Sequence, residues 1–248
     1  MRSIAARESN MTIDAEGLDF RQLNEYVKSA DSCEIENCLG QRFIAAGTDG
    51  KIVTIRGVAG NALGAYLAGG KITVYGNAQD AAGDTMNGGE IVVYGSAGDA
   101  AGYAMRGGEI YVKGNAGYRA GIHMKAYESK KPVLVVGGRA GSFLGEYQAG
   151  GLIIVLGLNT DGKPVVGNFP CTGMHGGKMF LRGGADGIKF PAQVTVNEAT
   201  EADLDEIAPY VKKYCEYFGA DFVKLISDTF AVVTPDSKNP YKQMYVAN

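Results

Sequence analysis

Short apolar runs recur along the chain, and a glycine-rich polar segment follows each of them. The runs are KIVTIR at 51–56, KITVY at 71–75, EIVVY at 90–94, EIYVK at 109–113, VLVV at 133–136, LIIVL at 152–156 and KMFLR at 178–182. Their length and their content of valine and isoleucine are typical of β-strands. Five of the runs begin directly after a Gly-Gly pair, so we expect strands and tight turns to alternate at a regular step.

The glycine-rich segments repeat the pattern G-x-x-G-x-x-x-G, whose starts step by 19 residues three times and then by 24. We interpret its glycines as structural turn residues, because glycine adopts positive φ without a Cβ penalty. They are Gly57, Gly60, Gly64, Gly76, Gly83, Gly95, Gly98, Gly102, Gly114, Gly117, Gly121, Gly138, Gly141 and Gly145, with Gln79 in place of a glycine in one copy. One strand with glycine turns at such a step is typical of a solenoid.

Two further columns support stacked coils. The third position of the pattern holds alanine in five copies: Ala59, Ala78, Ala97, Ala116 and Ala140. The eleventh position is mostly apolar: Leu67, Met86, Met105, Met124 and Gln148. The sequence therefore predicts an all-β solenoid of six coils, a single-stranded right-handed parallel β-helix with short α-helical caps at both ends. A left-handed hexapeptide solenoid would need an apolar residue at every sixth position, which this chain does not keep.

The chain divides into three segments: an N-terminal cap segment at 1–40, the glycine-repeat β-helix at 41–190, and a C-terminal helical cap and tail at 191–248. Asp19 predicts the N-cap of a helix over 20–28, and Thr200 with Asp203 predicts the start of a second helix. Gly219 is expected to stop that helix. Pro209 lies inside it and predicts a kink or two short helices.

Composition narrows the function. The 248 residues are 46% hydrophobic and 21% charged, enough for a large core, and the net charge is −3 with scattered Lys and Arg. That balance disfavours nucleic acid and anionic membrane surfaces as partners. No apolar run approaches the ~20 residues of a membrane helix, and the N-terminus lacks the apolar region of a signal peptide. We expect a soluble cytoplasmic protein.

The usual chemistry of active sites is missing, so we predict no catalytic, cofactor-binding or metal-binding residues. His123 and His175 both fall on predicted turns, and no G-x-S-x-G motif occurs. The four cysteines are expected to be reduced thiols, because Cys33 and Cys38 do not have a zinc-site spacing. Asp80 and Asp99 share one register and could bind calcium or a sugar, although such columns more often hydrogen-bond to backbone turns.

The longer step of the repeat contains a polar insertion at 126–132, which predicts a protruding loop. This loop and the polar C-terminal tail interrupt the repeat, so we expect them to contact partners. The candidate contact residues are Tyr127, Glu128, Lys130, Pro240 and Tyr241. Three further cations near corners, Arg106, Arg119 and Arg139, could also contact a partner, although isolated surface charges are more often solvated.

From about residue 40 to residue 184 the chain resembles the C-terminal glycine-repeat (GXGXG) domain of the glutamate synthase large chain. The glycine segments and the following Gly-Gly-(Lys/Glu)-Ile-x-Val strands carry the resemblance. The GMHGG turn at 173–177 and NPYKQMY at 239–245 resemble stand-alone forms of that domain. Formylmethanofuran dehydrogenase has a glycine-repeat subunit that shares the repeat.

The resemblance implies a right-handed β-helix that has no active site or cofactor of its own and is inactive alone. Its expected partners are a class II glutamine amidotransferase subunit, which releases ammonia, and a synthase subunit with FMN and an iron–sulfur cluster. The β-helix braces these two parts. The product is open between glutamate, N-methylglutamate and another compound, and self-association is also open.

The sequence therefore leaves three hypotheses about the function. The first is the structural subunit of a glutamate-synthase-like complex, and the second is the glycine-repeat subunit of a formylmethanofuran dehydrogenase-like complex. The third is an independent polysaccharide-acting β-helix, which would need a carboxylate cluster along one groove and usually a secretion signal.

Overall fold

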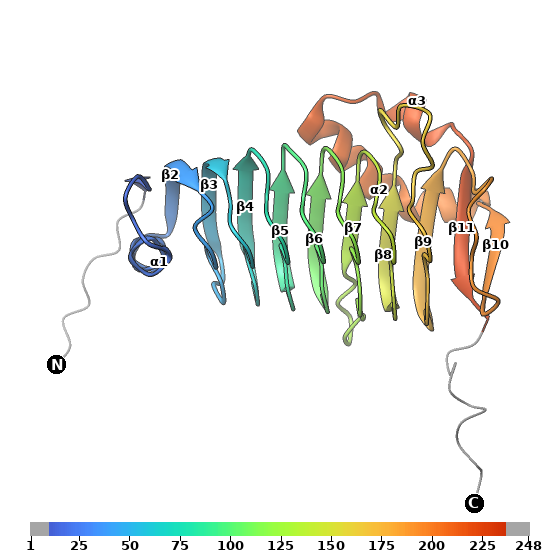
Figure 1. The fold of residues 1–248 in the computed structure, drawn as a ribbon, viewed down its shortest axis with the longest axis horizontal. Helices are drawn as coiled ribbons and strands as arrows, with labels where there is room; N and C mark the ends of the chain where they lie inside the picture. Colours follow the sequence, from blue (N-terminus) through green and yellow to red (C-terminus); the bar gives the residue numbers. More distant parts are fainter. Residues whose placement is uncertain (1–9, 237–248) are drawn as a thin grey trace, which may run out of the picture.

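A computed structural model of the chain describes residues 10–236, which form one long rod (Figure 1). The rod contains one eleven-stranded sheet and three helices. The strands are β1 (Met11–Asp14), β2 (Ser32–Leu39), β3 (Lys51–Val58), β4 (Gly70–Tyr75), β5 (Asn87–Val93), β6 (Gly107–Val112), β7 (Val133–Val136), β8 (Ala149–Val155), β9 (Gly176–Arg182), β10 (Val194–Glu198) and β11 (Phe230–Pro235). The helices are α1 (Phe20–Ser29), α2 (Glu201–Phe218) and α3 (Phe222–Ile226). None of these helices is long and apolar enough to cross a membrane.

Strands β1 to β9 stack in sequence order and pair in parallel, which confirms the predicted parallel solenoid. The stack is longer than the six coils expected, because β1 and β2 lie in the segment 1–40 that the sequence assigned to a cap. β2 has the sequence SCEIENCL and no Gly-Gly pair before it. A search for the glycine repeat therefore passes over this strand, although Cys33 and Ile35 face the core.

The interior of the rod consists of columns of like residues at successive levels. On β4, Ile72 and Val74 point inward, and their partners on β5 are Ile91 and Val93. The predicted column from Leu67 to Gln148 is fully buried. Burial of apolar side chains at ~25 cal/mol per Å² is the main force that holds coil on coil.

The turn glycines serve two different purposes. Six of the fourteen have positive φ, as expected: Gly57, Gly64, Gly83, Gly102, Gly121 and Gly145. The other eight do not, so the predicted reason for them is wrong: Gly60, Gly76, Gly95, Gly98, Gly114, Gly117, Gly138 and Gly141. A Cβ at Gly76 would lie only 1.9 Å from the carbonyl oxygen of Gly57 in the preceding coil. At Gly60, Gly76 and Gly141 the backbone of the preceding coil approaches too closely for a side chain. At the other five glycines a Cβ would first meet a side-chain oxygen of the preceding coil.

Positive φ is also adopted by many residues other than glycine. One corner of each coil places three alternating residues in the left-handed region, for example Ala62, Gly64 and Tyr66 with φ of 60°, 61° and 58°. In the coils from Gly64 to Gly145 the middle residue is glycine, and a Cβ at Gly64, Gly83 or Gly121 would press on an isoleucine side chain of the core. The outer two carry side chains that point away from the coil, and further along the rod they include Phe143 and Tyr147.

Helix α1 lies at the N-terminal end of the rod, as predicted (Figure 1). The carboxylate of Asp19 accepts hydrogen bonds from the backbone N–H groups of Arg21 and Gln22 at 2.8 and 2.9 Å. Leu23 and Val27 are fully buried against the first coils. At the other end β9 pairs with β11, which runs antiparallel and pairs in turn with β10.

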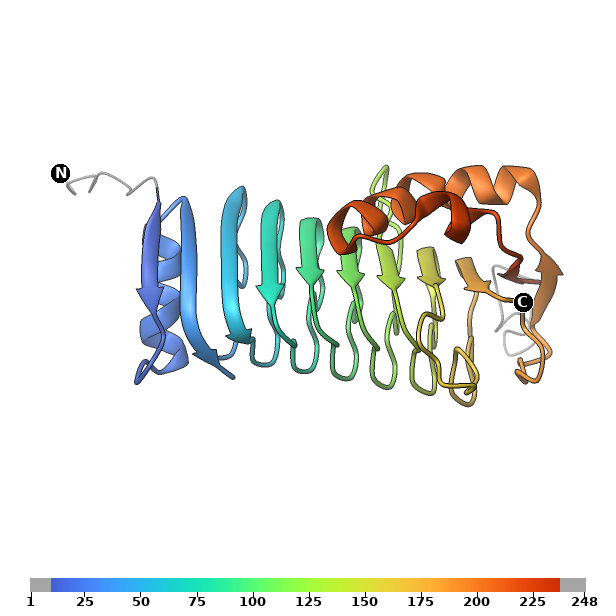
Figure 2. The same ribbon diagram turned by 90° about the horizontal axis from the view of Figure 1, so that it is seen from above.

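Helix α2 lies along the flank of the rod rather than over its end (Figure 2). It begins at the predicted capping pair, Thr200 with Asp203, and ends at Gly219 with φ of 71°. No second helix starts at Pro209, contrary to one expectation; α2 runs through this residue, which is exposed to solvent. Water can therefore hydrate the carbonyl that the proline leaves unpaired.

The outer face of the sheet explains where α2 packs. One outward column reads Thr54, Thr73, Val92, Tyr111 and Val135 along β3 to β7. The residues from Val92 onward are fully buried and form a second core cluster with α2. The threonines precede the covered part and remain partly exposed. The column is therefore polar where α2 does not cover the sheet and apolar where it does.

Candidate functional site

The insertion at 126–132 emerges between β6 and β7 as an exposed turn. Tyr127 and Lys130 exchange backbone hydrogen bonds at 3.2 and 2.9 Å, and the side chain of Tyr127 is about half exposed. Glu128 has φ of 55° at the tip. The turn is therefore closed on itself and available for contact, while Pro240 and Tyr241 lie outside the described residues.

The seam between α2 and the sheet contains a chain of charged and phenolic groups. Glu90 on β5 pairs with Lys213 of α2 at 2.6 Å and with Lys71 of β4 at 3.0 Å. It also accepts a hydrogen bond from the Tyr217 hydroxyl at 2.5 Å. Burial of Glu90 favours its neutral form, but these donors outweigh that effect and hold its pKa below the usual value. A hollow of ≈ 470 Å³ lies beside this group.

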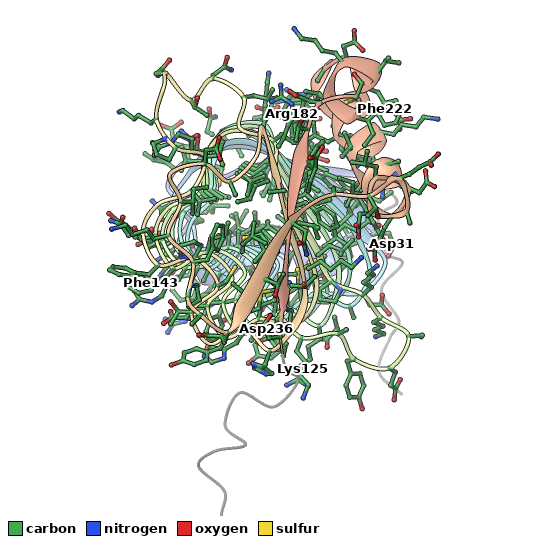
Figure 3. The ribbon with its side chains drawn as sticks, turned by 90° about the vertical axis from the view of Figure 1, so that its right-hand side faces the viewer. Asp31, Lys125, Phe143, Arg182, Phe222 and Asp236 are labelled. Carbon is green, nitrogen blue, oxygen red and sulfur yellow. The ribbon has the colours of Figure 1, made fainter. Side chains whose placement is uncertain are left out.

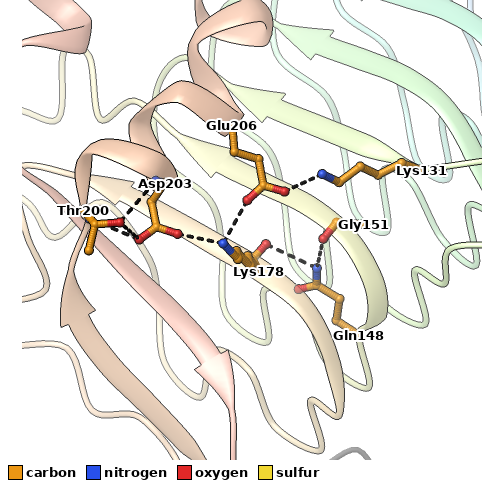
Figure 4. A network of polar contacts seen from close by, with 7 residues as sticks. All are labelled: Lys131, Gln148, Gly151, Lys178, Thr200, Asp203 and Glu206. Atoms are coloured by element: carbon orange, nitrogen blue, oxygen red, sulfur yellow. Dashed lines mark hydrogen bonds and ion pairs between the residues drawn. The ribbon is translucent and has the colours of Figure 1, made fainter.

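A second charged group joins the insertion to the helix (Figure 4). Lys178 of β9 pairs with Asp203 at 2.7 Å and with Glu206 at 2.9 Å. Lys131, at the end of the insertion, pairs with Glu206 at 2.5 Å. The Asp203 pKa is lowered mainly by Lys178, and the Glu206 pKa is lowered because its two lysine partners outweigh its burial. The exposed turn is thereby tied to α2.

These carboxylates predict a loss of stability in acid. Their pKa values are lower in the folded chain than the ordinary values of 4.5 for Glu90 and 3.8 for Asp203. Their contribution is therefore complete above those ordinary values and is lost as pH falls through the lower folded values. We expect the melting temperature to fall steeply below about pH 4, as measured by circular dichroism. Glu90→Gln should show a shallower fall than the wild type, and equal slopes would contradict this assignment.

The histidines have structural environments. The ring of His123 stacks on Tyr147 at 5.1 Å and meets the edge of Tyr103 at 6.0 Å. The Nδ1 atom of His175 lies 2.9 Å from the carbonyl oxygen of Gly173 in its own turn. Both rings thus make contacts within or between the turns of the rod.

The four cysteines are buried and unpaired. Burial raises the pKa of Cys33 to about 11 and that of Cys171 to about 12, so both are thiols at neutral pH. Within residues 10–236 no group of three or more His, Cys, Asp or Glu side chains is placed to hold a metal ion.

The stacked carboxylates of Asp80 and Asp99 serve the turns. Asp80 accepts a hydrogen bond from the backbone N–H of Asp99 at 2.9 Å, and Asp99 accepts one from that of Tyr118 at 2.8 Å. Asn61 begins this column by accepting from the backbone N–H of Asp80 at 3.2 Å. We call this column the Asn61 ladder. Its two carboxylates hydrogen-bond to the backbone of the next coil, which is the more common role expected for such a column.

A parallel column, the Asn77 ladder, runs along the neighbouring corner. Asn77 accepts from the backbone N–H of Ser96 at 2.8 Å, and Ser96 accepts from that of Asn115 at 3.1 Å. Asn115 then accepts from the backbone N–H of Arg139 at 2.8 Å. Sequence reasoning missed this column, whose one signal is a set of short polar residues at a step of 19.

Taken together, the described residues form a rod of stacked coils with small residues at its corners. A family model for the GXGXG motif matches residues 20–238. The chain belongs to the GXGXG motif family.

This member of the GXGXG motif family is similar to two known proteins, one in sequence and one in structure. The uncharacterized protein MJ1350 of Methanocaldococcus jannaschii is 43% identical over 95% of this chain and 96% of its own length. A chain of the formyltransferase/hydrolase complex FhcABCD from Methylorubrum extorquens, solved with methylofuran, has the same fold with a TM-score of 0.65. That chain is 20% identical, and the match covers 92% of this chain and 95% of that one.

Proposed function

We propose that this chain is a non-catalytic structural subunit of a multi-subunit enzyme of the glutamate-synthase type. The observation that carries the proposal is the match of residues 20–238 to the GXGXG motif family. It is supported by residues 10–236, in which no group of three or more His, Cys, Asp or Glu side chains is placed to hold a metal ion. A rod of stacked coils presents the same surface at fixed intervals, which suits a brace between larger proteins. Its partners are a class II glutamine amidotransferase subunit and a synthase subunit that holds FMN and an iron–sulfur cluster.

A second candidate is the equivalent subunit of a formylmethanofuran dehydrogenase-like complex. The structural likeness to a chain of the FhcABCD complex favours it. In that case the partners would carry a molybdenum or tungsten pterin centre instead of FMN.

The test is purification of the tagged chain from its native cell extract, with mass spectrometry of the associated proteins. Co-purification of an amidotransferase and a flavoprotein supports the first candidate. Molybdenum or tungsten in the purified complex supports the second. A chain that purifies alone under mild conditions would argue against both, since each requires partner subunits.

The insertion and the tail are the proposed contact regions, and removal of residues 237–248 should weaken assembly. This deletion begins beyond β11, which ends at Pro235, and beyond Asp236, which hydrogen-bonds with Thr195. The rod should therefore keep its melting temperature while the yield of co-purified subunits falls several-fold.

The matched variant on the insertion is Tyr127→Ser with Glu128→Ser and Lys130→Ser. It leaves Lys131 in place, so the pair with Glu206 on α2 is preserved. If both variants retain the full complement of partners, the contact regions have been assigned wrongly.

A further inference from the structure

The two corner ladders end at the same place on the rod. In the Asn77 ladder the last residue is Arg139, which offers a cationic donor where the earlier residues offer acceptors. In the column of the Asn61 ladder, Ser142 accepts from the backbone N–H of Asn168 at 3.0 Å. Asn168 is the last residue of that column, and the described part of the chain supplies no further N–H for its side-chain amide.

A groove lies where these columns end. One hollow of ≈ 580 Å³ is lined by Arg139, Asn168 and Phe169, together with Ile188 and Lys189 from the loop after β9. A neighbouring hollow of ≈ 320 Å³ shares Arg139 with it. A volume of about 300–1,000 Å³ is typical of binding sites. We call the two hollows the ladder groove.

The regular repeat alone would not form this groove. The corner alanines step by 19 residues along the middle of the rod, but the partner of Ala140 in the next coil is Val166, 26 residues on. The longer loop between them and the loop after β9 supply the walls. The groove thus occupies the position that the corner of one more coil would fill.

The ladder groove is positive. Arg139 and Lys189 line it, and no Asp or Glu is among the residues that line either hollow. Arg139 uses Nε to donate to the carbonyl oxygen of Pro164 at 2.5 Å. Its two Nη atoms have no partner within residues 10–236, so they can form a bidentate contact with a carboxylate.

Phe169 at the rim supports a binding role. It has φ of 58° and its side chain is 62% exposed. The equivalent corner positions of the middle coils hold the smaller Ala62, Ala81 and Ala100, whereas aromatic residues occupy this corner at Phe43, Phe143 and Phe169. In Figure 3 Phe143, the preceding residue of this column, points outward on the side of the sheet opposite α3. This flank is free of the helices that cover the other face.

We propose that the ladder groove binds an extended acidic segment of a partner polypeptide. Four earlier residues of this column, Asn61, Asp80, Asp99 and Ser142, accept a backbone N–H from the next coil, whereas Tyr118 does not. An added peptide strand would offer Asn168 the same kind of donor. Carboxylates on that strand pair with Arg139 and Lys189, and an apolar side chain packs against Phe169. This inference rests on the proposed function, because it takes the segment from a partner subunit.

The chain's own residues 237–248 are a poorer match. They include Lys238 and Lys242 and contain no Asp or Glu. Two added cations would repel Arg139 and Lys189. Binding of this segment is therefore the competing outcome of the test.

The experiment replaces Phe169 with the photo-crosslinking residue p-benzoylphenylalanine in the complex purified from native cells. The change is aromatic for aromatic at an exposed position, so folding should persist. We expect a crosslink to an acidic segment of a partner subunit. The same replacement at Tyr75, which is exposed at the end of β4 and packs against Tyr94, serves as the control and should not crosslink to that segment.

Charge reversal completes the test. Arg139→Glu with Lys189→Glu should reduce the crosslink about tenfold or more, and Lys189→Glu alone should reduce it in part without touching the Pro164 contact. Replacement of the acidic residues of the crosslinked segment by lysine should restore the crosslink in the double variant. A crosslink to residues 237–248, to a basic segment, or one insensitive to charge reversal would overturn the inference while co-purified partners keep the proposed function intact. Absence of any co-purified subunit would instead reject the proposed function.

Discussion

Gly76→Ala should destabilise the rod by about 3–5 kcal/mol, one of the largest effects expected from a single methyl group. The Cβ would lie 1.9 Å from the carbonyl oxygen of Gly57 and 2.9 Å from its carbonyl carbon. Both atoms belong to the backbone of the preceding coil and cannot rotate away. The two coils must separate locally, which weakens the hydrogen bonds between their parallel strands and the packing of the core side chains beneath those strands. Urea unfolding followed by circular dichroism measures the loss.

Gly47→Ala is the matched control for this variant. Gly47 also lies at a corner and has φ of 67°, but a Cβ there would meet no atom within 4 Å. Its cost should be limited to about 1 kcal/mol for the left-handed conformation, which Ala45 and Ala62 already adopt nearby. If the two variants unfold at similar urea concentrations, close backbone approach is not what requires glycine at position 76.

This pair of glycines also shows what could be predicted from the sequence. The repeat identified the coils, their strands and the buried columns, because each level uses the same residues for the same contact. The reason for glycine could not be read from the pattern, since a position with φ of 67° and one with a 1.9 Å backbone approach look identical in sequence. Distances between coils decide between them.

The position of α2 along the rod is a second feature that could not be predicted from the sequence. The Thr200–Asp203 cap and the stop at Gly219 predicted the helix itself, since both signals are local. Its position along the flank depends on the change from Thr73 to Val92 in the outward column, which has meaning only once the strands are aligned. The ladder groove was missed for the same reason, because Arg139 and Lys189 are 50 residues apart in the chain.

The flank covered by α2 and the flank with the corner ladders expose different kinds of surface. The helix seals the apolar outer columns and ties the insertion to the rod through Lys131 and Glu206. The opposite flank exposes aromatic side chains and the positive ladder groove. The proposed role as a brace between two other proteins needs two distinct surfaces, and these two flanks differ in the way that role requires.

Tyr111→Ala should destabilise the attachment of α2 by about 3–5 kcal/mol. Tyr111 on β6 is fully buried between the sheet and α2, in the cluster that contains Val92 and Val135. Its ring meets Tyr217 edge-on at 5.4 Å, and its hydroxyl donates to Glu109 at 2.6 Å. Alanine would leave a cavity and remove the ring contact, so amide exchange in α2 should accelerate. Hydrogen exchange read by mass spectrometry follows α2 and the strands separately.

Tyr111→Phe separates packing from hydrogen bonding, because it keeps the ring and removes only the hydroxyl. Glu109 would still pair with Lys213 at 2.7 Å, so the expected cost is about 1 kcal/mol. In both variants the amides of β3 and β4 should exchange at wild-type rates, since their inward side chains belong to the other core cluster. Faster exchange throughout the rod after Tyr111→Ala would show that α2 is part of the solenoid's own cooperative unit. Acceleration confined to α2 would show that the rod can hold its shape while the flank that anchors the insertion is released.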